Sequence, residues 1–175
     1  MNTISFKEVA LQEFDREMAT TRKVLERVPF AEKEAWKPHA KSTPLGRLAL
    51  HVANLAGMPV NILTQDALTF GKPGGAADAP KVATTDDLVA LFDGKTKEAR
   101  AALDAATDER FAGEWELAFD DGTNPPRQIF KGTRALAYRS LFMDHLIHHR
   151  AQLGVYLRLN DVEIPGSYGP SADEQ

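Results

Sequence analysis

The sequence contains no cysteine. This absence excludes disulfides, a thiolate nucleophile, and zinc or iron–sulfur sites that depend on cysteine. It fits a cytoplasmic protein, and we expect that location. No apolar run reaches the roughly 18 residues that a membrane span requires. The chain becomes charged soon after its first residues, so we see no signal peptide.

An excess of positive charge is also missing. Lysine and arginine number 21 against 25 aspartates and glutamates, which gives a formal net charge of −4. No basic stripe stands out that would neutralise phosphates, so we expect no nucleic-acid partner. The chain has 175 residues, of which 43% are hydrophobic and 26% charged. This composition is ordinary for a globular protein and predicts one domain over residues 1–175 with its own core.

Helix-start signals divide most of the chain. Ser5 and Glu8 form an S-x-x-E capping box, and Thr43 followed by Pro44 predicts a second start. Thr84 or Thr85 predicts a third, after a stretch at 71–83 that is rich in glycine and proline and reads as a loop. A long apolar segment at 133–159, without proline, predicts the fourth helix.

Before the fourth helix the hydrophobic period changes from helical to alternating. Trp115, Leu117 and Phe119 alternate with other residues, which predicts a short strand. Asp121-Gly122 is a turn signal, and residues 127–130 are suited to the returning strand. The predicted fold is therefore all-α, a four-helix bundle with a small β-hairpin inserted before the last long helix.

The last helix carries the chemistry. His145 and His149 lie one turn apart, so their side chains share a face and form a natural pair of ligands for a divalent transition metal. His51 falls on the apolar face of the second helix. Burying three imidazoles without partners costs free energy, and a shared cation satisfies them together. His148 competes as a ligand through i, i+3 spacing, although the helical angle favours His149.

A site with three histidine ligands leaves coordination positions free for water or substrate, which is typical of a catalytic rather than a structural metal. Each ligating ring also needs an acceptor for its other nitrogen, and the sequence does not say which residue supplies it. Helical facing and side-chain chemistry select candidates for the pocket wall: Trp36, Tyr138, Gln152 and Tyr156.

The run H-x-x-H-H-R-x-Q-L-x-V-Y-L-R at 145–158 resembles the DinB/YfiT-like superfamily, as does the tail I-P-G-S-Y-G-P-S-A-D-E at 164–174. The resemblance covers essentially the whole chain and implies a four-helix bundle with a three-histidine metal site. Carried over by position, the ligands are His51, His145 and His149. Zinc or nickel is the implied metal, and members are often dimers. The chain departs from the commonest motif by having Ala151 where glycine is frequent, which should alter packing rather than ligation.

What the resemblance implies about activity is less specific. Relatives include thiol-dependent transferases and isomerases, so we expect a metal-dependent transferase or hydrolase. Its substrate would be a small molecule, with a low-molecular-weight thiol as the second reactant. The alternative is a non-catalytic stress or binding protein, a helical bundle in which the metal supplies folding free energy.

A second apolar strip on the last helix lies roughly opposite the histidines and includes Met143, Ile147, Ala151 and Gly154. A helix that is apolar on two sides needs two partners. We expect this strip to meet another subunit in a homodimer. The alternative is that the hairpin or the C-terminal tail of the same chain covers it.

Overall fold

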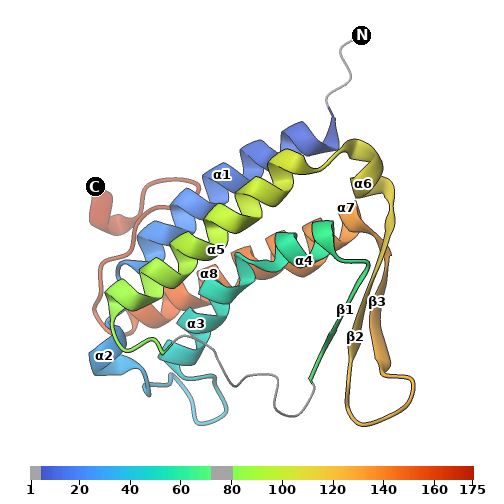
Figure 1. Cartoon of the computed structure of the whole chain (residues 1–175). Helices are drawn as coiled ribbons and strands as arrows, with labels where there is room; N and C mark the ends of the chain where they lie inside the picture. Colours follow the sequence, from blue (N-terminus) through green and yellow to red (C-terminus); the bar gives the residue numbers. More distant parts are fainter. Residues whose placement is uncertain (1–4, 72–80) are drawn as a thin grey trace.

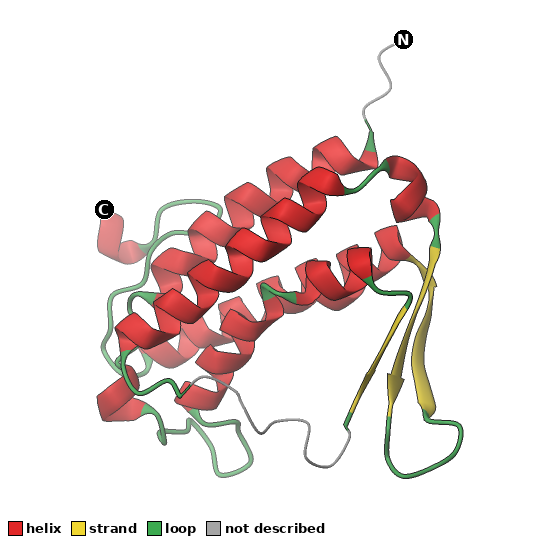
Figure 2. Ribbon diagram, viewed as in Figure 1, coloured by secondary structure: helices red, strands yellow, loops and turns green. Residues whose placement is uncertain are grey.

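The computed structural model describes residues 5–71 and 81–175, so most of the predicted loop at 71–83 lies outside the described residues. The described chain is mostly helical, with a three-stranded sheet at one end of the helices (Figures 1 and 2). No described helix is both long enough and apolar enough to cross a membrane.

The first helix, α1 (Phe6–Leu25), begins at the predicted capping box. The backbone N–H of Glu8 donates to Ser5 Oγ and that of Ser5 donates to Glu8 Oε2, each at 3.1 Å. The inner face of α1 buries Phe14, Met18 and Leu25. A short helix, α2 (Phe30–Lys33), follows it.

The second predicted helix is divided into α3 (Leu45–Leu55) and α4 (Met58–Thr64), with Gly57 at the N-terminal cap of α4. The prediction that Thr43 caps this helix is wrong, because Pro44 holds the cap position and no side chain bonds to the helix there. The first turn of α3 is held by packing instead of a capping bond, since Leu45 and Leu48 are buried.

The third helix, α5 (Thr85–Ala105), begins at Thr84, whose hydroxyl accepts from the backbone N–H of Asp87 at 3.1 Å. It packs against α1, α3 and α4. Two ion pairs connect it to α1, one between Arg22 and Asp93 at 2.9 Å and one between Arg100 and Asp15 at 2.7 Å. The short α6 (Asp108–Ala112) then leads into the sheet.

The sheet has the order β1-β2-β3. The two predicted strands are β2 (Glu114–Phe119) and β3 (Arg127–Thr133), which pair antiparallel. A third strand, β1 (Ala67–Phe70), pairs parallel with β2, and the prediction of only two strands was wrong. Three of the four side chains of β1 are exposed, so its sequence shows no alternation that would reveal a strand.

The last long helix is continuous but not regular. It comprises α7 (Arg134–Ala137), a π-helical turn η1 (Tyr138–Met143) and α8 (Asp144–Arg158). A π-turn has i→i+5 hydrogen bonds and therefore more residues per turn than an α-helix. Side chains before the π-turn are thus rotated relative to those after it, which the assumption of one uniform helix at 133–159 did not include.

The tail after α8 runs back along α1 and ends in a single 3₁₀ turn, η2 (Ala172–Glu174), as Figure 1 shows in red. Of the predicted second strip, Met143 is fully buried within the chain, whereas Ala151 is exposed. Ala151 and Gly154 line a shallow cavity together with the tail residues Ile164 and Pro165. The tail therefore lies beside this strip and leaves part of it open.

Candidate metal centre

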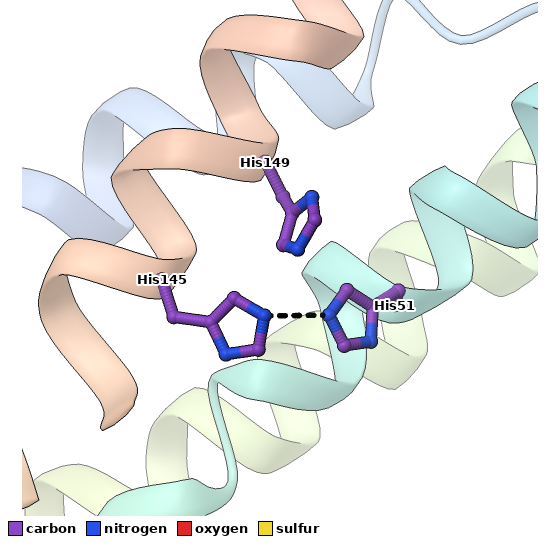
Figure 3. Close-up of side chains that lie close together, drawn as sticks. All are labelled: His51, His145 and His149. Atoms are coloured by element: carbon purple, nitrogen blue, oxygen red, sulfur yellow. Dashed lines mark hydrogen bonds between the residues drawn. The ribbon is translucent and has the colours of Figure 1, made fainter. Parts of the chain in front are cut away.

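Two helices position the three histidines. His51 projects from α3, and His145 and His149 project from successive turns of α8, which packs against α3. In Figure 3 the three rings point toward one another across the space between these helices. One nitrogen from each ring lies within 4.8 Å of the other two. The Nε2 atoms of His51 and His145 are 3.2 Å apart.

The rings are packed together but keep partial access to solvent. Their centroids are 5.0 Å apart for His51 and His145, 4.6 Å for His51 and His149, and 4.7 Å for His145 and His149. Facing Nε2 atoms can share one proton in a hydrogen bond, or both can direct lone pairs at a cation. A cluster of three imidazoles is a donor set that suits zinc, nickel and related ions.

The electrostatics of the cluster favour neutral rings. Burial lowers the pKa of His51 from 6.5 to about 4, and the neighbouring His149 and His145 add to the effect. Burial also lowers the pKa of His145, with His149 as the second cause, while a backbone hydrogen bond with Leu141 acts in the opposite direction. A metal binds the unprotonated imidazole, so lowered pKa values leave these nitrogens available near neutral pH.

Two contacts orient the rings of α8 from behind. Gln152 Oε1 lies 2.7 Å from His149 Nδ1, so a proton on Nδ1 is donated to the amide and Nε2 keeps its lone pair. The backbone of Leu141 is the hydrogen-bond partner of the His145 ring. These are the acceptors that the sequence could not identify, and Gln152 has the usual place of an outer partner in a metal site.

The structure separates the five histidines of the chain. His148 is exposed and outside the cluster, although its ring centroid is 4.9 Å from that of His149. His39 is exposed in the loop before α3, where its Nδ1 accepts from the backbone N–H of Lys41 at 3.2 Å. The cluster thus consists of the three residues that helical facing had selected.

The proposed wall residues divide into three groups. Gln152 touches His149, as described. Trp36 and Tyr156 pack edge to face with ring centroids 5.6 Å apart, and Tyr156 lies one turn beyond Gln152 on α8. Tyr138 is fully buried, and its hydroxyl donates to the carbonyl of Ala10 in α1 at 2.9 Å.

Tyr138 is therefore a core residue and not part of a wall around the histidines. The cause is the π-turn at Tyr138–Met143, which rotates Tyr138 away from the angle that a uniform α-helix would give it. Sequence reasoning also missed Arg47, whose charge contributes to the lowered pKa of His51. Its position one turn before His51 on the same helix was the available signal.

Fold and site together define a class: a mostly helical protein with a three-histidine cluster, contributed by two helices, that could hold a metal ion. The family model for the DinB family matches residues 1–175. The chain belongs to the DinB family.

Solved structures agree with this assignment at the level of the fold. A DinB-like protein from Bacillus subtilis superposes with a TM-score of 0.65 at 21% sequence identity, covering 91% of this chain and 96% of that one. A DinB-like protein from Bacillus cereus gives a TM-score of 0.67 at 21% identity, covering 92% and 97%. No protein with a curated description matches this chain in sequence.

Proposed function

We propose that this protein binds a divalent metal ion through His51, His145 and His149, and that the site is catalytic. Zinc or nickel is the proposed ion, and a thiol-dependent transferase or a hydrolase is the proposed type of enzyme. The scaffold would be a four-helix bundle formed by α1, by α3 with α4, by α5, and by the long helix ending in α8.

One observation carries the proposal: three imidazole nitrogens from two helices converge within 4.8 Å. Partly burying three imidazoles side by side costs free energy, and a shared cation would offset that cost. The lowered pKa values of His51 and His145 support the same conclusion, because protons compete weakly for those nitrogens at neutral pH.

Three protein ligands leave coordination positions for a reactant. When bound, a divalent ion there would act as a Lewis acid and lower the pKa of a coordinated thiol or water. The chain itself would bind and orient the reactant. Gln152 fixes the ring of His149, and the aromatic pair of Trp36 and Tyr156 offers an apolar surface one turn away.

The charge around the histidines favours an anionic reactant. Neither residues 35–65, which include α3, nor residues 145–160, which include most of α8, contain an aspartate or glutamate. The protein therefore supplies no carboxylate from these segments to neutralise a dication. A thiolate or an anionic oxygen of the substrate would provide that compensation, which supports a thiol as one reactant.

The test is elemental analysis of protein purified without a nickel column, together with single alanine variants. We expect about one divalent ion per chain in the wild type and loss of the ion in His51→Ala and His145→Ala. His148→Ala is the matched control, because it removes an adjacent histidine outside the cluster, and it should keep the ion. Protein that stays metal-free after incubation with zinc, nickel and manganese would exclude the proposal.

The thiol can be tested separately. In cobalt-substituted protein, adding a low-molecular-weight thiol should change the visible absorption spectrum if the sulfur joins the coordination sphere. A thioether of similar size is the control and should leave the spectrum unchanged. Equal spectra with thiol and thioether would remove the thiol from the proposal and leave hydrolysis as the reaction to screen.

One observation favours a second candidate, a non-catalytic protein stabilised by its metal. Two cavities of about 380 Å³ lie elsewhere, and no histidine lines either of them. Under this candidate the metal would be coordinatively closed and would act through stability alone. Failure of water, thiol or azide to exchange onto the cobalt-substituted site would favour it.

We also propose a homodimer, with the open part of the second strip on α8 as the contact. Val155 and Leu159, next to this strip, are 59% and 58% exposed, which is high for large apolar side chains. Light scattering at micromolar concentration tests the dimer, and Val155→Glu should dissociate it. A monomeric wild type would exclude it.

A further inference from the structure

A buried ion pair joins α8 to α1 on the side of α8 away from His51. Arg150 of α8 and Glu17 of α1 have side chains that are 3% and 1% exposed, and Arg150 Nη1 lies 2.7 Å from Glu17 Oε2. The same guanidinium donates to the carbonyl of Glu17 and to Thr21 Oγ1, each at 3.2 Å. Arg150 directly follows the candidate ligand His149.

The C-terminal tail completes this pair through Tyr168. The Tyr168 hydroxyl accepts from Arg150 Nη2 and donates to Glu17 Oε2, both at 3.1 Å. The guanidinium groups of Arg150 and Arg16 lie 5.6 and 5.8 Å from the centre of the Tyr168 ring, within the range of cation–π attraction. One tail residue therefore contacts both members of the buried pair.

The tail is folded into a defined shape that presents Tyr168 at this point. Asp173 accepts from Arg158 of α8 at 3.0 Å and from the backbone N–H of Ile164 at 2.9 Å. Glu174 accepts from the backbone N–H groups of Gly166 and Ser171 at 2.9 and 3.0 Å. A Cβ atom on Gly166 would lie 2.2 Å from the Gly169 carbonyl oxygen, so only glycine fits there.

These contacts constrain how α8 is placed. The helix packs against α3, which carries His51, and against α1, which carries Glu17. A rotation or shift of α8 that moved His145 and His149 relative to His51 would also pull Arg150 from Glu17 and Tyr168. Breaking a buried, hydrogen-bonded pair is costly, so the network resists that movement. Metal sites tolerate deviations of only about 0.2 Å in ligand distance, so small movements matter.

We propose that the C-terminal tail sets the position of α8 relative to α3, and that Tyr168 is a positioning residue for the three-histidine cluster. This inference rests on the proposed metal-binding function. Tyr168 touches none of the histidines, and it acts through Arg150 and Glu17.

The experiment compares Tyr168→Phe with Thr85→Val. Each change deletes one hydroxyl that bonds across elements, and Thr85 donates to the Val28 carbonyl at 2.7 Å, far from α8 in the chain. Both should lower the melting temperature slightly, because Tyr168→Phe loses two hydrogen bonds and Thr85→Val loses one. Zinc affinity is then measured by chelator competition at 25 °C, where circular dichroism shows every variant folded. Tyr168→Phe should bind zinc about 3- to 10-fold more weakly than wild type, and Thr85→Val should bind as wild type does.

The outcomes separate this inference from the metal site itself. Equal zinc affinity in the wild type and Tyr168→Phe overturns the inference while the metal site stands. If the wild type binds no zinc, the proposed function fails and the positioning role is judged in metal-free protein. There, nuclear Overhauser contacts between the rings of His51 and His145 should weaken in Tyr168→Phe but not in Thr85→Val. Unchanged contacts in Tyr168→Phe overturn the inference in that case as well.

Discussion

The two sides of α8 differ in how their polar side chains are paired. Toward α1, Arg150 finds a carboxylate, a carbonyl and two hydroxyls, so its charge is compensated within the chain. Toward α3, the Nε2 atoms of His145 and His51 have each other at 3.2 Å. One side is complete as the chain folds, and the other brings together three imidazole nitrogens that could hold a metal ion. The comparison shows how a single helix can combine a fixed support with a cluster that could hold a metal ion.

The largest expected effect comes from breaking the complete side. Glu17→Gln leaves the buried guanidinium of Arg150 without its counter-charge, and we expect a loss of about 3–5 kcal/mol in the free energy of unfolding. Urea unfolding of the metal-free protein measures this. Arg16→Gln is the control, since Arg16 bonds the same carboxylate at 3.0 Å but its side chain is 66% exposed, so its loss should be below about 1 kcal/mol.

The double variant Glu17→Met with Arg150→Met sharpens that result. Replacing a buried pair by apolar groups of similar volume is often close to neutral, so the double variant should be more stable than Glu17→Gln. A double variant as unstable as the single one would mean that the neighbouring hydroxyls, and not the unpaired charge, cause the loss.

The next effect concerns the face of α8 that carries His145 and His149 toward α3, called the open side below. A metal ion at 100 times its dissociation constant should raise the free energy of unfolding by about 2.7 kcal/mol. Thermal unfolding with and without chelator measures the shift. His51→Ala should abolish it, whereas His148→Ala, outside the cluster, should keep it. An equal shift in His51→Ala would place the stabilising ion elsewhere on the chain.

A smaller effect should follow from removing an outer contact of the open side. Gln152→Ala takes the acceptor from His149 Nδ1, 2.7 Å away, and should weaken metal affinity about 10-fold. Because Gln152 is exposed, unfolding of the metal-free protein should change little. Chelator competition gives the affinity. Gln152→Glu retains an acceptor and should bind metal at least as tightly as wild type, and an equal loss in both variants would contradict the orienting role.

The convergence of the histidines could be predicted because the residues that bring them together follow regular α-helix geometry. His145 and His149 lie after the π-turn, and His51 lies within the unbroken α3, so a period of 3.6 residues placed all three rings correctly. Whether they bind metal stays a prediction. Tyr138 was misplaced because it lies within the π-turn, whose position no pattern in the sequence reveals.

The complete side could not be predicted, because it depends on contacts between distant parts of the chain. Tyr168 and Glu17 are 151 residues apart in sequence. Glu17 follows Phe14 and precedes Thr21 at helical spacing, so it lies on the buried face of α1, but nothing in that pattern names its partner. The strand β1 was missed for the same kind of reason, since its pairing with β2 and not its own sequence makes it a strand.

The smallest expected effect is the pH dependence of the metal-free open side. Burial holds the pKa of His51 at about 4, against 6.5 ordinarily, so between these pH values the unfolded chain binds a proton that the folded chain does not. The free energy of unfolding is therefore highest above pH 6.5 and decreases as the pH falls toward 4. The decrease is modest because the His51 ring is partly exposed. Melting temperatures measured on metal-free protein, with chelator present, should fall less steeply over this range in His51→Ala than in the wild type. His39→Ala removes an exposed histidine and should follow the wild type, whereas parallel profiles for all three proteins would show that His51 is not the group responsible.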